Sequence, residues 1–93
     1  MKTQQLKDFR RAILFVLDAA GPRRGLTTEA IVHNIQRFGF RPDVIETERE
    51  LLYLAGKPLE LAELVPAGGF SPEVRCWRLT TAGRNFVAEE DVE

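Results

Sequence analysis

The sequence has few of the residues on which disulfides, metal clusters and redox chemistry depend. Its 93 residues include one cysteine, Cys76, and one histidine, His33. A lone cysteine cannot form a disulfide within the chain, which agrees with a reducing compartment, and it excludes cysteine-based metal clusters. We expect Cys76 to be a small apolar side chain on a strand and His33 to lie on a helix surface. The sequence therefore predicts no metal site and no cofactor.

The sequence also lacks a long apolar run and any catalytic motif. Its first residues lead into an amphipathic segment and not into a signal peptide, so we expect a cytoplasmic protein with no membrane partner. Gly68-Gly69 is not followed by the Lys-Ser/Thr of a phosphate-binding loop. His33 has no nucleophile partner in a recognisable motif. We predict a single non-enzymatic domain over residues 1–88, followed by an acidic tail at 89–93.

The chain has no overall excess of positive charge, because its formal net charge is −1. Residues 89–93 contain four acids and no base, so residues 1–88 carry 13 bases against 10 acids, a net charge of +3. Ten of the 13 bases are arginine, which suits bidentate contacts with phosphate and base edges. The simpler explanation of the asymmetry is a solvated acidic tail, but the body of the domain is mildly basic.

Apolar periodicity predicts a helix over residues 3–20 and a second one over about 28–38. In the first helix Leu14 and Phe15 widen the apolar face, which predicts either a homodimer through the first and last helices or coverage by the last helix. In the second helix we expect the buried residues to be Ile31, Ile35 and Phe38. A short edge strand at residues 26–27 is predicted to precede this helix.

A third helix is predicted over residues 42–55, with Pro42 at its first position and Asp43 beside the positive end of its dipole. Gly56 is expected to end it. Its core-facing stripe consists of Val44, Thr47, Leu51, Leu54 and Ala55. Only a short turn with Gly39 separates it from the second helix, which is the helix-turn-helix arrangement.

The remaining residues predict a β-hairpin and a last helix. Strands over about 59–65 and 74–79 surround a loop rich in glycine and proline, and we expect Trp77 to be a hydrophobic anchor. Thr80 or Thr81 is expected to cap a helix over about 82–89. The fold class is α+β, in the order helix, helix, helix, hairpin, helix.

This order resembles the winged helix of small MarR-, ArsR- and PadR-like regulators. Two stretches carry the resemblance: Thr47, Leu51, Leu54 and Leu59, with Pro58 where glycine is usual, and the run from Trp77 to Arg84. Small proteins of this layout are common in bacteriophages, which suggests a phage or prophage origin. The resemblance implies a transcriptional regulator that binds double-stranded DNA through the third helix and the hairpin wing. The DNA-contacting residues that it implies are Thr28, Arg41, Asp43, Glu46, Thr47, Arg49, Glu50, Arg75 and Arg78.

The acidity of the third helix supports an alternative, because acids facing phosphate lower affinity for DNA. In this alternative the domain is an adaptor that binds a protein through the acidic third helix and Phe70 of the wing. The two hypotheses differ in what they predict for the basic side chains. DNA binding requires a continuous basic surface, whereas the adaptor predicts arginines that are scattered or paired internally. The bases in question are Arg23, Arg24, Arg41, Arg49, Lys57, Arg75 and Arg78.

Overall fold

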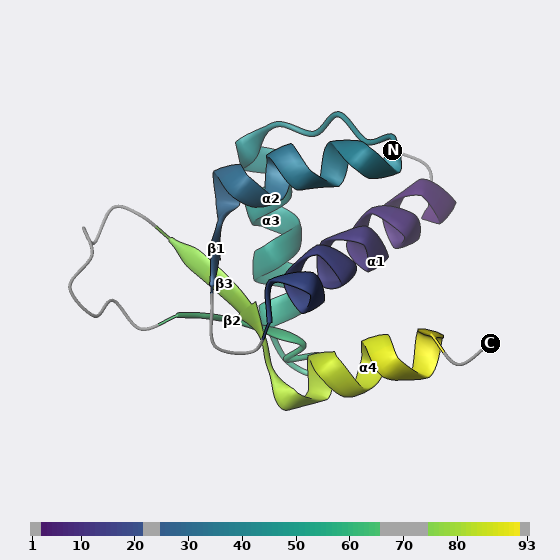
Figure 1. The fold of residues 1–93 in the computed structure, drawn as a ribbon, viewed down its shortest axis with the longest axis vertical. Coiled ribbons are helices and arrows are strands. Elements are labelled where there is room, and N and C mark those ends of the chain that lie inside the picture. Colours follow the sequence, from purple (N-terminus) through teal and green to yellow (C-terminus); the bar gives the residue numbers. More distant parts are fainter. Residues whose placement is uncertain (1–2, 22–24, 66–74, 92–93) are drawn as a thin grey trace.

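Four α-helices and a small antiparallel sheet make up the described part of the chain, residues 3–21, 25–65 and 75–91 of a computed structural model. The elements in order are α1 (Thr3–Ala20), β1 (Leu26–Thr27), α2 (Thr28–Ile35), the 3-10 helix η1 (Gln36–Phe38), α3 (Val44–Ala55), β2 (Ala62–Leu64), β3 (Cys76–Leu79) and α4 (Thr81–Asp91). In Figure 1, α1 lies between the α2–α3 pair and α4, and the sheet lies beside them. The predicted α+β class is confirmed. No helix among the described residues is long and apolar enough to cross a bilayer.

The sheet has the strand order β1-β3-β2, so β3 pairs with both other strands. The predicted edge strand at residues 26–27 is confirmed, with Leu26 opposite Trp77. The predicted hairpin is also antiparallel, but β2 begins only at Ala62. The chain turns at Glu60, whose φ of 46° lies in the left-handed region and interrupts the extended conformation. The predicted loop at residues 66–73, including Phe70, lies outside the described residues.

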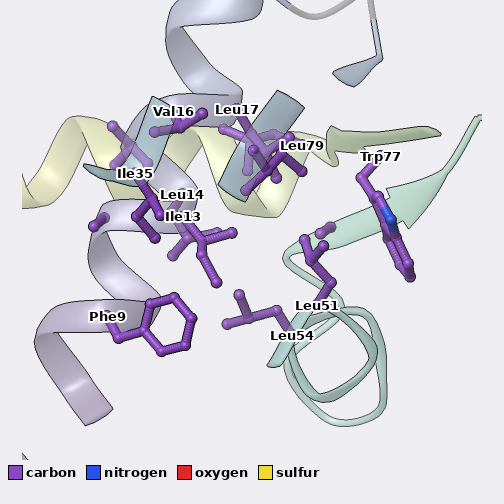
Figure 2. Close-up of a cluster of buried hydrophobic side chains, with 14 residues drawn as sticks. Phe9, Ile13, Leu14, Val16, Leu17, Ile35, Leu51, Leu54, Trp77 and Leu79 are labelled. Carbon is purple, nitrogen blue, oxygen red and sulfur yellow. The ribbon is translucent and has the colours of Figure 1, made fainter. Parts of the chain in front are cut away.

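The core forms where α1, α3 and β3 meet. Phe9 and Ile13 of α1, Leu51 and Leu54 of α3, and Trp77 of β3 are all buried and point into one cluster (Figure 2). Trp77 is fully buried, as predicted for a hydrophobic anchor. Apolar burial of this kind contributes roughly 25 cal/mol per Å² and holds the third helix against the sheet.

The last helix packs against α1. Leu14 is buried, whereas Phe15 is half-buried and borders the open hollow between α1 and α2. The predicted homodimer through these helices stays a prediction. Thr80 caps α4, because its Oγ1 accepts from Gly83 N at 3.0 Å. α4 continues to Asp91, two residues beyond the predicted end of the last helix.

Three expectations for the helix-turn-helix segment were wrong in detail. α3 begins at Val44 with Asp43 as its N-cap, so Pro42 precedes the helix. Val44, which was predicted for the core-facing stripe, is 40% exposed. The second helix tightens into η1 after Ile35, and Phe38 is half exposed at its end. Phe38 borders an open hollow between α1 and α2, so its outer side is uncovered by the described residues.

Candidate functional site

The third helix is fixed at both ends by hydrogen bonds that its own sequence provides. Asp43 Oδ1 accepts from Glu46 N at 2.7 Å, which satisfies one of the free N–H groups of the first turn. Gly56 N donates to the carbonyls of Leu52 and Tyr53 at the other end. Asp43 is exposed but serves as this cap, so its carboxylate has a structural role.

Two of the residues predicted to contact DNA lie inside the domain. Thr47 is fully buried, and its Oγ1 donates to Asp43 O at 2.9 Å. Thr28 is also buried, and its Oγ1 accepts from Trp77 Nε1 at 2.9 Å. The resemblance to winged-helix regulators implied that both threonines contact DNA at the surface. The structure corrects this, because both hydroxyls serve the core.

The outer face of α3 presents two aliphatic side chains. Ile45 is 69% exposed and Leu52 is 50% exposed, and they are seven residues apart, so they lie on one stripe of the helix. Arg49 lies between them and is exposed. We name these three residues the outer stripe. Sequence reasoning missed Ile45 and Leu52, although apolar residues at i and i+7 away from the core stripe are a readable signal.

An ion pair on each side of the outer stripe ties α3 to a neighbouring element. On the hairpin side Glu48 accepts from Arg75 at 2.6 Å. On the α1 side Glu50 accepts from Arg10 Nε at 2.6 Å, and the Arg10 guanidinium lies 3.8 Å from the centre of the Tyr53 ring. Glu50 and Arg75 were both predicted to face DNA, and each has an intramolecular partner instead.

The basic side chains named above are largely engaged within the domain. Arg78 pairs with Glu63 at 2.8 Å. Arg41 donates to the carbonyls of Gln36 and Phe40. Arg49 and Lys57 are exposed and form no ion pair with a described residue.

Arg23 and Arg24 lie outside the described residues. Within the described part, Arg75 and Arg78 are ion-paired, which leaves Arg41, Arg49 and Lys57 as the named bases without an ion pair. Of the nine predicted DNA contacts, the structure brings Asp43, Glu46 and Arg49 together on the exposed part of α3, with Arg41 just before its N-terminus.

The described residues do not form a metal-binding cluster. No three His, Cys, Asp or Glu side chains among them lie close enough together to hold an ion. His33 is exposed on α2 and Cys76 is half-buried on β3, as predicted. The chemistry of this region is therefore that of a contact surface: two aliphatic side chains, one arginine and flanking ion pairs.

Comparisons with known proteins found no relative of this chain. Family models, curated proteins and solved structures were searched, and none matches this chain.

Proposed function

We propose that this chain is a small non-enzymatic winged-helix domain that binds a protein partner through the outer stripe of α3. The observation that carries this proposal is the exposure of Ile45 and Leu52 on one stripe. Ile45 and Leu52 lie two helical turns apart, and complete burial of an exposed side chain of this size contributes at most about 1.5–3 kcal/mol. Exposed apolar groups that gather on one helix face, with charges around them, are typical of protein interfaces.

The winged-helix assignment is part of the same proposal. It is supported by the element order and by the antiparallel pairing of β1, β3 and β2. In this arrangement the second and third helices form the helix-turn-helix, and the β2–β3 hairpin forms the wing. α3 then has one face in the core and the opposite face free for a partner.

The ion pairs favour protein over DNA as that partner. Binding to duplex DNA depends on cations that neutralise phosphates and release counterions. Arg75 and Arg78 of the proposed wing are neutralised by Glu48 and Glu63. Recruiting them to phosphate would require breaking these pairs. Arg49 is then the one base on the outer stripe, which is a weak electrostatic basis for DNA affinity.

Double-stranded DNA is the second candidate, in the role of a transcriptional regulator. It is supported by the helix-turn-helix order and by two exposed arginines, Arg41 just before the α3 N-terminus and Arg49 on the outer stripe. Aliphatic side chains can also contact thymine methyl groups in the major groove. Protein and DNA partners would thus use the same face of α3.

Site-specific photo-crosslinking in the cells that express the chain separates the two candidates. A benzophenone amino acid replaces Ile45 in one variant and the exposed Ala88 of α4 in a control. We expect a discrete, protease-sensitive adduct from position 45 and not from position 88. Leu52→Glu in the position-45 variant should abolish the adduct without unfolding the domain, because Leu52 is half exposed.

The other outcomes of this experiment are equally specific. A nuclease-sensitive adduct from position 45 would support the DNA candidate. Anisotropy of labelled random duplex DNA at low and moderate salt would then show steep salt dependence. Identical adducts from positions 45 and 88, or none from either, would refute a specific partner at the outer stripe.

A further inference from the structure

A second surface, separate from the outer stripe, lies between α1, α3 and α4 and includes Tyr53. It is an open hollow of about 230 Å³ whose apolar walls include Leu14, Leu54, Leu59 and Phe86. At the liquid volume of about 30 Å³ per water molecule it holds roughly seven waters, or one or two aliphatic side chains. None of the outer-stripe residues lines it.

The described charged residues that line this hollow are all basic. Lys7, Arg10 and Arg11 line it from α1, and no carboxylate is among the lining residues that the structure describes. Apolar walls with basic groups along one edge complement a ligand that carries carboxylates beside aliphatic side chains. The complementarity concerns both charge and apolar surface, so a purely apolar segment or a bare anion would use only half of it.

Arg10 has two intramolecular contacts that orient its guanidinium. Its Nε donates to Glu50 at 2.6 Å, and its guanidinium lies over the Tyr53 ring at 3.8 Å. These contacts use one N–H and one face of the guanidinium. Four further N–H donors remain on its terminal nitrogens, and two of them can bind a carboxylate in a bidentate manner. A guanidinium that is already ordered loses less entropy when it binds.

We propose that this hollow is a docking site for an acidic amphipathic helix of a partner protein. An aliphatic side chain of the partner enters between Leu54 and Phe86, and a neighbouring carboxylate binds Arg10. Lys7, one helical turn before Arg10, provides a second cation on the same face. This site is separate from the outer stripe, so the domain would have two faces for partners.

The test uses the full chain and a fluorescein-labelled synthetic peptide of about four helical turns. The peptide has leucine at every third or fourth position and glutamate elsewhere. A reference peptide has glutamine in place of every glutamate. Fluorescence anisotropy should show saturable binding of the glutamate peptide, roughly tenfold tighter than that of the glutamine peptide. Equal affinity for both peptides, or no saturable binding of the glutamate peptide, would overturn the proposal.

Variants of the chain locate the binding. Lys7→Gln should lower the affinity for the glutamate peptide roughly 2–5-fold. Arg10→Lys keeps the charge but loses the bidentate geometry, so it should lower this affinity by at least as much. Lys57→Gln is the matched control, because it removes an exposed lysine outside the hollow and should leave affinity unchanged. If it weakens binding as much as Lys7→Gln, the peptide is bound by net charge alone.

Glu50→Gln gives a prediction of opposite sign. Glutamine keeps an oxygen acceptor for Arg10 but removes the negative charge that competes with the ligand. Affinity for the glutamate peptide should therefore rise roughly 2–5-fold, which damage to the fold cannot imitate. A loss of affinity would refute the role given to Arg10. Leu52→Glu on the outer stripe should have no effect, so this proposal and the one for the outer stripe fail independently.

Discussion

A buried hydrogen bond between the sheet and α2 provides the sharpest test of the fold. Trp77 is fully buried, and its Nε1 donates to Thr28 Oγ1 at 2.9 Å across 49 residues of sequence. Thr28→Val keeps the shape of the side chain and removes the acceptor. A buried donor left without a partner costs about 1–3 kcal/mol. We expect the free energy of unfolding to fall by about that amount, a large part of the 5–15 kcal/mol typical of a domain.

Two further variants separate the hydrogen bond from packing. Thr28→Ser keeps the hydroxyl and removes one methyl group, so it should cost about 1 kcal/mol. Trp77→Phe removes the donor, and in that background Thr28→Val should cost much less because no N–H is left unpaired. The coupling energy of the double-mutant cycle should be about 1–2 kcal/mol.

Urea denaturation, followed by circular dichroism at the helical band, measures the unfolding free energy of the four proteins of the cycle. This signal does not depend on tryptophan, so it also serves for the two variants that lack Trp77. The slope of unfolding free energy against urea should be unchanged among them, which shows that the same surface is exposed on unfolding. A coupling energy below about 0.5 kcal/mol, the usual error of additivity, would refute the hydrogen bond as a stabilising contact.

Three other tests concern the termini and the charge of the helices. Gly83→Ala places a Cβ against the Leu61 carbonyl oxygen, so it should lower the unfolding free energy by about 1–3 kcal/mol in thermal melts. The control, Ala82→Gly, should lower it by about 1 kcal/mol through helix propensity alone. Asp43→Ala should lower stability to urea by about 1 kcal/mol, and Asp43→Asn should restore most of it if the side chain acts as a cap. Glu48→Lys should change stability by less than about 1 kcal/mol, yet raise low-salt affinity for random duplex DNA in anisotropy titrations, because it also frees its arginine partner.

Periodicity was sufficient to predict most of the fold. The stripe of Thr47, Leu51 and Leu54 is buried as predicted, because each is three or four residues from the next on one face of a regular helix. Periodicity failed at Phe38, which follows the end of the α-helix at Ile35 and borders an open hollow beside α1. A repeat of 3.6 residues says which side a residue faces and not whether anything covers that side.

The candidate site was less predictable, because its contacts join distant parts of the sequence. Arg10 and Glu50 are 40 residues apart, and Arg75 and Glu48 are 27 residues apart. Neither pairing follows from local spacing, since a helix brings together only residues three or four apart. Thr28 was assigned to the surface for the same reason, because its partner lies on another element.

These pairings explain why a helix rich in acids is compatible with either partner class. Asp43 caps the helix, Glu48 binds Arg75, and Glu50 binds Arg10, so each of these acids has a structural partner. The exposed charges at α3 without an ion pair to a described residue are Asp43, Glu46 and Arg49, and together with Arg41 just before the helix they sum to zero. The field around the outer stripe therefore neither strongly attracts nor strongly repels phosphate. What distinguishes the surface is its aliphatic content, and burial of aliphatic groups drives association with proteins more strongly than association with a phosphate backbone.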